Sequence, residues 1–368
     1  MATATEILDH LTRESSLCDA LDDQRVQCKA CAHRCKIAAG RRGVCQVRFN
    51  HEGKLYVPWG YVASAAVDPI EKKPYYHFLP GSDALTFGML GCNLKCNFCQ
   101  NWLSSQTLRD PQADGAVNSI QHISSEQLVA AAVRNQAAVI ASSYNEPLIT
   151  SEWAQEIFSL AKAEGIQCVY VSNGFATPEV LEYLQPVMRG FKVDLKTMQE
   201  KQYKELGASL QPVLDSIIKA HELGMWVEVV TLVIPGFNDS TEELWDAARF
   251  ITSVSEDIPW HVTAYHPDYN QDAPATSSTI LQRAADVGQE AGLRYVYAGN
   301  LPGRVGSLEN THCPKCGTVL IRRRGYTIQE YHLTGEGKCP KCGMAIAGVW
   351  TDKPEDVRIG GWGMPRWI

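Results

Sequence analysis

The chain has 368 residues, enough for one large domain and one or two small ones, since single hydrophobic cores stop growing near about 250–300 residues. Hydrophobic residues make up 45% of it and charged residues 20%, which is typical of a globular protein and excludes a largely disordered chain. The net charge of -7 provides no basic field, and no apolar run is long enough for a bilayer, so we expect neither nucleic acid nor a membrane as a partner.

The first residues are polar and acidic and lack the basic start and apolar stretch of a secretory signal. We therefore expect the protein to be cytoplasmic. In that reducing compartment, the 13 cysteines indicate metal sites rather than disulfides, because most of them are clustered.

The first cluster lies in a predicted N-terminal cysteine-rich module, residues 1–80. It consists of Cys28, Cys31, Cys35 and Cys45. Four thiolates suit either zinc or an auxiliary iron–sulfur cluster. We favour a structural zinc ion here, because Cys28 and Cys31 have the spacing of a zinc knuckle.

Residues 81–302 alternate short β-branched runs with amphipathic stretches, the pattern of repeated βα units. Helix signals include Ser124 with Gln127, Ser240 with Glu243, and a periodic stretch at 278–292. The predicted strands are 85–90, 138–143, 167–172, 191–195, 226–234, 261–265 and 295–298. This pattern predicts an α/β fold, a partial (β/α)6 barrel with a parallel sheet.

A second cysteine group, Cys92, Cys96 and Cys99, follows the first predicted strand as CxxxCxxC. Its thiolates would lie at the carboxyl edge of the sheet, where α/β proteins form their sites. Three thiolates can hold three irons of a [4Fe–4S] cluster and leave the fourth iron open. By spacing alone, a zinc loop or three buried thiols are the alternatives.

The third group is Cys313, Cys316, Cys339 and Cys342, two CPxCG knuckles that predict a zinc ribbon over residues 303–350. Four free thiols or a rubredoxin-like iron are the alternatives. A four-thiolate ion has no open position, so we expect a structural role. Residues 351–368 form a predicted C-terminal tail.

The CxxxCxxC loop, with Phe98 before its last cysteine, resembles the radical S-adenosylmethionine (SAM) motif. Segments 68–74, 99–102, 144–147 and 265–268 resemble the radical enzymes of the AmmeMemoRadiSam system, relatives of pyruvate formate-lyase activating enzyme. The resemblance implies that the open iron binds SAM. It also implies that a reduced cluster cleaves SAM to methionine and a 5′-deoxyadenosyl radical, with flavodoxin or ferredoxin as an electron donor.

The resemblance also implies cofactor contacts for several residues, most of them at predicted strand ends. Glu146 is expected to accept hydrogen bonds from the SAM ammonium, Asn173 to contact the ribose, and Lys196 to neutralise the carboxylate. Asp194 matches a residue near a monovalent cation, with a simple Asp–Lys pair as the alternative. His266 matches a histidine near the nucleoside, with a structural histidine as the alternative. Phe98 is the remaining cofactor-binding candidate.

We therefore expect a radical SAM enzyme that abstracts hydrogen from an organic substrate. The likeness to glycyl-radical activases implies a glycine of a partner protein as the donor. The alternatives are a small molecule or another protein as substrate, and a non-catalytic zinc-dependent interaction protein. The intact cysteine triad and Glu146 argue against the last of these.

Overall fold

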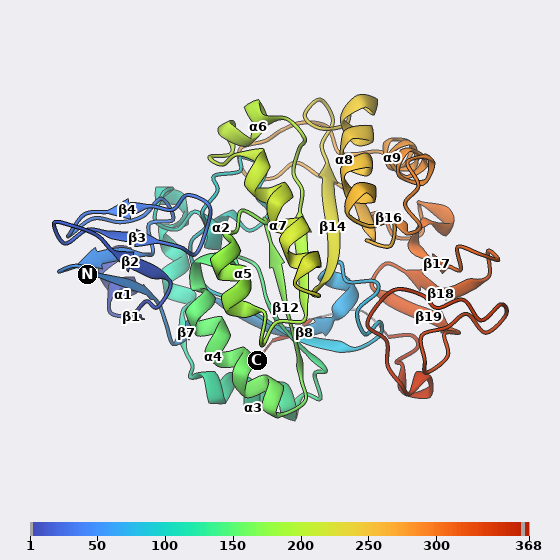
Figure 1. The fold of residues 1–368 in the computed structure, drawn as a ribbon, viewed down its shortest axis with the longest axis horizontal. Helices are drawn as coiled ribbons and strands as arrows, with labels where there is room; N and C mark the ends of the chain where they lie inside the picture. The colour runs from blue at the N-terminus through green and yellow to red at the C-terminus, as the bar shows by residue number, and fades with distance from the viewer. Residues whose placement is uncertain (1–2, 362–364, 368) are drawn as a thin grey trace.

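One large sheet forms the centre of the molecule (Figure 1). The computed structural model describes residues 3–361 and 365–367, and its sheet has nine strands in the order β16-β15-β14-β13-β12-β11-β9-β8-β20. The strands from β9 to β16 in this sheet are parallel, and successive ones are neighbours. They are β9 (Asp83–Gly88), β11 (Val139–Ser142), β12 (Gln167–Ser172), β13 (Gly190–Asp194), β14 (Trp226–Val233), β15 (Trp260–Ala264) and β16 (Val296–Gly299).

The sheet is an open, partial barrel. Strands β16 and β20 are its two edges, and within the described ranges they do not pair with each other. The predicted fold class is thus confirmed, and each predicted strand is present with its ends shifted by at most two residues. Strand β9 ends at Gly88 and not at residue 90. A Cβ at Gly88 would lie 2.6 Å from the Ser143 carbonyl oxygen, so only glycine allows this close approach.

Helices cover the outer face of the sheet (Figure 1). Ser124 and Gln127 form the predicted capping box of α3. Ser240 caps α8, but the Glu243 carboxylate accepts the Met198 N–H (2.8 Å) instead of returning to the cap. The helices are α1 (Ala4–Asp9), α2 (Trp102–Ser105), α3 (Ser125–Arg134), α4 (Ser151–Ala163), α5 (Pro178–Leu184), α6 (Glu200–Glu205), α7 (Leu210–Glu222), α8 (Thr241–Val254) and α9 (Ser278–Glu290), with 3-10 turns η1 (Ile70–Lys72), η2 (Pro111–Ser119), η3 (Pro147–Thr150), η4 (Gly306–Glu309) and η5 (Pro354–Asp356).

The two faces of the sheet differ in chemistry. Side chains alternate along a strand, so in β13 Phe191 and Val193 join the hydrophobic core while Lys192 and Asp194 pair with each other on the other face. On the neighbouring β14, Glu228 is fully buried and binds His261 of β15 (2.6 Å). This face of the sheet therefore carries buried ionisable side chains that are paired with one another.

The N-terminal residues form two small antiparallel sheets beside the barrel, and β7 forms a third with β10 from later in the chain. Their orders are β2-β3-β4, β1-β6-β5 and β10-β7. These strands are β1 (Thr12–Glu14), β2 (Cys18–Ala20), β3 (Val26–Cys28), β4 (Lys36–Ile37), β5 (Phe49–His51), β6 (Lys54–Pro58), β7 (Tyr61–Val62) and β10 (Gln121–His122).

The strand β8 (Ser64–Pro69) pairs antiparallel with β9 in the main sheet, although the predicted N-terminal module extends to residue 80. The strand β20 (Arg366–Trp367) also joins the main sheet, from the predicted tail. The module boundaries at residues 80, 302 and 350 stay a prediction.

The C-terminal module is a three-stranded sheet packed against the barrel. It consists of β17 (Thr311–His312), β18 (Val319–Arg324) and β19 (Thr327–Tyr331). Arg323 of β18 is buried, donates to the Tyr76 carbonyl oxygen (2.8 Å) and lies over the Tyr76 ring. His77 binds the Ala347 carbonyl oxygen (2.7 Å). These buried polar contacts fix the module at one place on the barrel.

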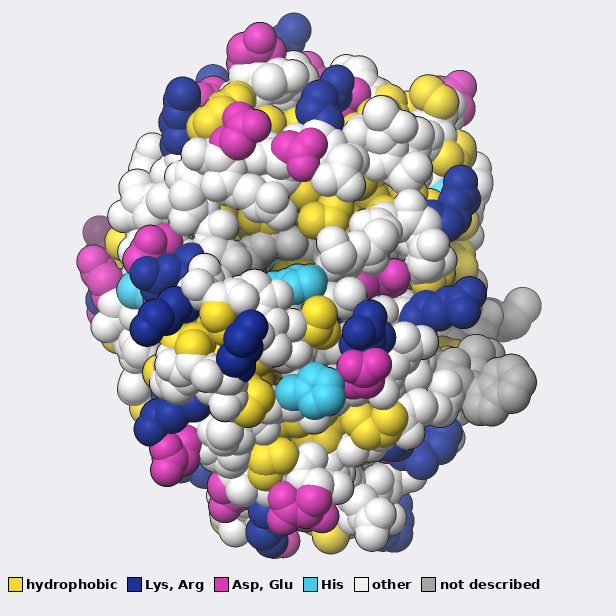
Figure 2. All heavy atoms as spheres, turned by 90° about the vertical axis from the view of Figure 1, so that its right-hand side faces the viewer, with side chains coloured by type: hydrophobic (Ala, Val, Ile, Leu, Met, Phe, Trp, Pro, Cys, Tyr) yellow, Lys and Arg dark blue, Asp and Glu magenta, His cyan; other side chains and the backbone are white. Residues whose placement is uncertain are grey.

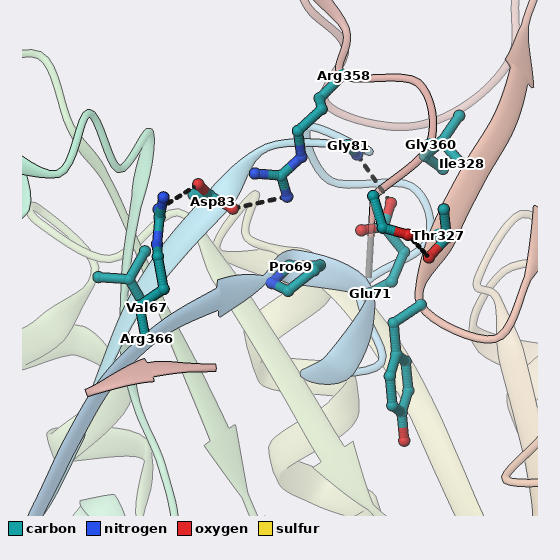
Figure 3. A pocket seen from close by; sticks show the side chains of 12 residues that line it. Val67, Pro69, Glu71, Gly81, Asp83, Thr327, Ile328, Arg358, Gly360 and Arg366 are labelled. Atoms are coloured by element: carbon teal, nitrogen blue, oxygen red, sulfur yellow. Dashed lines mark hydrogen bonds and ion pairs between the residues drawn. The ribbon is translucent and has the colours of Figure 1, made fainter. Parts of the chain in front are cut away.

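The chain beyond this module returns to the edge of the main sheet. Asp83 pairs there with Arg358 (2.7 Å) and Arg366 (2.6 Å), beside a pocket whose other wall is β19 (Figure 3). Glu71 in this pocket accepts the Gly81 N–H (2.8 Å), and burial raises its pKa to about 7. The returning segment thus covers the outer edge of β8, which would otherwise expose unpaired backbone groups.

The surface shows no extended field of one charge on the face that carries the C-terminal module, because Lys and Arg side chains alternate there with Asp and Glu (Figure 2). Among the described residues, none of the helices combines the length and apolar character needed to cross a membrane.

Candidate active site

The loop that follows β9 carries Cys92, Cys96 and Cys99 at the carboxyl edge of the parallel strands. Burial raises the pKa of all three thiols, and that of Cys96 reaches about 11. Buried thiols of this kind become thiolates when a cation binds them. The loop thus has the donors of a metal centre at the edge where the fold places active sites.

The spacing of these sulfurs differs from that around a single ion. Around this loop, within the described part of the chain, no three ligand atoms lie within 4.8 Å of one another. The Leu94 N–H lies 3.4 Å from the Cys92 sulfur, and the Asn93 Nδ2 is buried with no hydrogen-bond partner among the described residues. Sulfurs that do not converge on one point, a backbone N–H near sulfur and a side-chain amide without a partner fit a [4Fe–4S] cluster, because the sulfides of such a cluster accept hydrogen bonds.

Arg109 holds the cysteine loop in shape, and no sequence motif indicated it. Its guanidinium donates to the carbonyl oxygens of Cys92 (2.6 Å) and Leu94 (2.6 Å), and also to that of Val44 (2.5 Å) in the N-terminal region. A planar guanidinium can bind several carbonyls at once, which a lysine cannot. The residue is therefore a positioning residue for the cluster loop.

We expect Arg109→Met to lower the free energy of unfolding by about 1.5–3 kcal/mol and to speed loss of iron, because three backbone acceptors lose a charged donor. Urea unfolding and the decay of iron–sulfur absorption in the presence of a chelator measure the two effects. The exposed Arg134 at the end of α3 supplies the matched control, Arg134→Met. Equal iron retention in the two variants would contradict this role.

Glu146 follows β11 and is 3% exposed. Its carboxylate accepts hydrogen bonds from the Ser172 hydroxyl (2.7 Å) and from the N–H groups of Asn173 (2.8 Å) and Leu148 (3.1 Å). Burial nevertheless raises the pKa of Glu146 to about 7. A cationic ligand beside this carboxylate would offset the cost of burying its charge.

Asn173 follows β12 and contacts the cysteine loop directly. Its amide donates to the Asn93 side-chain oxygen (2.7 Å) and lies 3.9 Å from the Cys92 sulfur. At the next residue, Gly174 has φ +72°, and a Cβ there would lie 2.5 Å from Val193. Glycine is thus required for the tight turn that presents Asn173, whose contact with ribose stays a prediction.

Asp194 and Lys196 lie at the end of β13 with Lys192. The Asp194 carboxylate pairs with both lysines. Burial acts to raise the pKa of Asp194, but the two ammonium groups outweigh it and lower the pKa overall. Burial acts to lower the pKa of Lys196, but Asp194 and Cys96 outweigh burial and raise the pKa overall. Lys196 is therefore a cation beside the loop. The Asp–Lys alternative is thus present, and the monovalent cation stays a prediction.

His266 follows β15, and its Nε2 accepts a hydrogen bond from the side-chain amide of Gln100 (3.0 Å). Gln100 is the residue that follows Cys99. Phe98 is buried and packs edge-on against Phe237, with ring centroids 5.5 Å apart. The structure thus gathers the six predicted cofactor contacts around one loop. Gln100, Asn93 and Lys192 also lie here and were not predicted as contacts: Asn93 and Gln100 stand within recognised segments that gave them no role of their own, and Lys192 stands in none.

The two flanking cysteine quartets differ in geometry. In the C-terminal quartet, all four sulfurs lie within 4.8 Å of one another, and two pairs are 3.5 and 3.7 Å apart. The structure therefore forms a group there that suits one tetrahedral ion. The N-terminal quartet lines one small cavity, and no three of its sulfurs lie within 4.8 Å of one another. It consists of Cys28, Cys31, Cys35 and Cys45.

The arrangement is that of a radical SAM protein: a partial barrel with three cysteines on the loop after its first parallel strand. Residues 87–251 match the family model described as the radical SAM superfamily. The chain belongs to this superfamily and is an enzyme of the radical SAM class. Membership implies a [4Fe–4S] cluster and SAM.

Among proteins of known sequence, the chain is 37% identical over 338 residues to the uncharacterized protein MJ0808 of Methanocaldococcus jannaschii, covering 91% of this chain and 98% of that one. It is 28% identical to the GTP 3',8-cyclase of Aquifex aeolicus (73% of this chain, 81% of that one). It is 26% identical to the putative glycyl-radical enzyme activating enzyme MJ1632 of M. jannaschii (50% and 68%). Pyruvate formate-lyase-activating enzymes are also relatives, as expected.

Proposed function

We propose that SAM binds between the cysteine loop and the ends of β11, β12, β13 and β15. Glu146 would accept the methionyl ammonium, and Lys196 would neutralise the carboxylate. Asn173 would contact the ribose, and His266 and Phe98 would lie near the nucleoside of SAM. The observation that carries this proposal is that the buried carboxylate of Glu146 lies near the Cys92 thiol, while the Lys196 cation lies near the Cys96 thiol.

A [4Fe–4S] cluster held by Cys92, Cys96 and Cys99 would supply the electron for reductive cleavage of SAM, and through it the hydrogen abstraction from the substrate. The chain's own residues do the rest. Glu146 and Lys196 would hold the methionyl end of SAM and Asn173 its ribose, while Arg109 fixes the cysteine loop.

A cavity of about 560 Å³ is the candidate substrate site. It spans the open side of the barrel, since its lining comes from the segment after β8 and from the end of β16. His266 and Gln100, which adjoin the cysteine loop, line this cavity together with Arg324 and Tyr326 at the β18–β19 turn. The C-terminal module thus forms part of the cavity that would receive the substrate.

We propose a glycine of a partner protein as the hydrogen donor, with flavodoxin or ferredoxin as electron donor. The sequence similarity to a putative glycyl-radical enzyme activating enzyme supports this proposal. A small polar molecule is the second candidate. Two observations support that alternative. The lining of the cavity includes the ionisable residues Glu71, Glu309 and Arg324, and the chain is similar in sequence to GTP 3',8-cyclase.

The two candidates can be separated with anaerobically reconstituted enzyme, SAM and a reductant, mixed with cell extract. A partner glycine predicts a glycyl radical doublet in the electron paramagnetic resonance spectrum, which the Cys96→Ala variant does not produce. A small molecule predicts no doublet, but faster formation of 5′-deoxyadenosine when an ultrafiltrate of the extract is added.

We also propose a structural zinc ion in the C-terminal quartet. The mutual distances within 4.8 Å support a single ion, because four thiolates at about 2.3 Å from zinc lie about 3.8 Å apart. Such an ion would hold the two knuckles together and thereby place the β18–β19 turn at the cavity.

A further inference from the structure

The four N-terminal cysteines converge on one buried place. Cys28 ends β3, Cys31 and Cys35 lie in the next loop, and Cys45 lies between β4 and β5. Cys28, Cys31 and Cys45 are less than 9% exposed. Gly43 packs against the Cys35 sulfur, from which a Cβ would be only 3.5 Å away. Such a buried group of four thiols needs a cation to be stable as thiolates.

The molecule holds two kinds of sulfur spacing, and the N-terminal quartet has the wider one. Over residues 3–361 and 365–367, only the C-terminal quartet brings three or more such ligand atoms within 4.8 Å of one another. Among the described residues, neither the N-terminal quartet nor the loop of Cys92, Cys96 and Cys99 brings three sulfurs that close together. Around a cubane each thiolate binds a different iron, so the sulfurs stand further apart than around zinc.

The surroundings of the quartet also suit a cluster with negative charge. The Val44 N–H donates to the Cys35 sulfur (3.4 Å), and the Arg48 guanidinium lies 3.6 Å from the Cys28 sulfur. Arg48 is 1% exposed, and Glu152 holds it in a buried ion pair. The Arg48–Glu152 pair is neutral as a whole, so the site offers a cluster hydrogen-bond donors to sulfur, from Val44 and from Arg48, which are among the features that tune iron–sulfur clusters.

From this geometry we propose that Cys28, Cys31, Cys35 and Cys45 hold a second [4Fe–4S] cluster. The knuckle spacing of Cys28 and Cys31 favoured zinc. The tertiary positions of the sulfurs favour the cluster. All four irons would have a thiolate, so the site has no open iron for a substrate and suits electron transfer.

The two cysteine loops touch each other. His33, between Cys31 and Cys35, binds the Asn93 carbonyl oxygen (2.9 Å), next to Cys92. On the other side, Arg109 joins the carbonyl oxygens of Val44 and Cys92. These contacts offer two hydrogen-bonded paths for an electron from the second cluster to the first. The second cluster is oxidised and the first reduced by one electron, and a low-potential one-electron donor protein restores the second. This transfer step rests on the proposed function, whereas the metal site does not.

Metal and sulfide analysis of anaerobically reconstituted protein tests the site. The wild type should hold about eight irons and eight sulfides per chain, as two cubanes require. The variant with Cys92, Cys96 and Cys99 all changed to alanine should keep about four of each and still give the signal of a reduced [4Fe–4S] cluster. Adding Cys31→Ala and Cys45→Ala should remove them, while Cys313→Ala with Cys339→Ala should not.

Zinc without sulfide at the quartet, or about four irons in the wild type, would overturn the proposal. The wild-type count decides the matter even if a variant fails to fold. The triple variant lacks the proposed SAM site, so its result does not depend on whether SAM is cleaved.

For the transfer step, the Cys31→Ala/Cys45→Ala variant should slow reduction of the remaining cluster by flavodoxin at least tenfold, but not its reduction by dithionite. Equal rates with flavodoxin would exclude a relay.

Discussion

Cys96→Ala is expected to reduce formation of 5′-deoxyadenosine to background. The variant keeps two of three thiolates on the loop, too few to hold the cluster that membership in the superfamily implies. The measurement is product analysis after anaerobic incubation with SAM and dithionite.

Cys168→Ala is the matched control, because Cys168 is a buried thiol of β12 whose pKa is raised by burial alone. This control should remain active. Background activity in the wild type, or equal activity in Cys96→Ala, would contradict the assignment of the loop.

Glu146→Gln is expected to weaken SAM binding by roughly 10- to 150-fold, which corresponds to about 1.5–3 kcal/mol for a charge-assisted hydrogen bond. The variant keeps the size of the side chain and leaves every cysteine in place, so the iron content should not change. Equilibrium binding of SAM to the reconstituted, unreduced protein measures the loss without requiring turnover.

The matched control is Glu228→Gln. Glu228 is also a fully buried carboxylate, and it accepts the backbone N–H groups of Tyr76 (3.0 Å) and His77 (2.9 Å), away from the cysteine loop. It should lower stability but leave SAM affinity within about twofold. An unchanged affinity in Glu146→Gln, or equal losses in both variants, would show that Glu146 does not contact SAM.

The proposed SAM site and the proposed second cluster meet at the Arg109 contacts. Because this guanidinium reaches both cysteine loops, its replacement should disturb both sites, whereas loss of the C-terminal quartet should leave the iron in place. The N-terminal region is therefore expected to act with the barrel, and the C-terminal module to act through the substrate cavity.

The sequence alone determined the class of the protein and the course of its sheet. Strands β9 to β16 of the main sheet are short apolar runs between amphipathic stretches, so local hydrophobic periodicity is enough to predict them. The triad Cys92, Cys96 and Cys99 was also predictable, since its ligands lie within eight residues and their spacing is set by one loop. The two CPxCG knuckles of the C-terminal quartet were predictable for the same reason, because each is a short motif whose two cysteines are close in sequence.

Only the tertiary structure decided the features that depend on residues distant in sequence. Arg109 gives no local signal, because its role arises from backbone carbonyls that the fold brings to it. The strand β20 joins the main sheet by pairing with β8, which lies near the other end of the chain. The spacing of Cys28, Cys31, Cys35 and Cys45 gave zinc as the favoured ion, but separations in space depend on the folded path between the cysteines. Sequence spacing counts residues, whereas a metal responds to distances between sulfur atoms, and those exist only once the chain has folded.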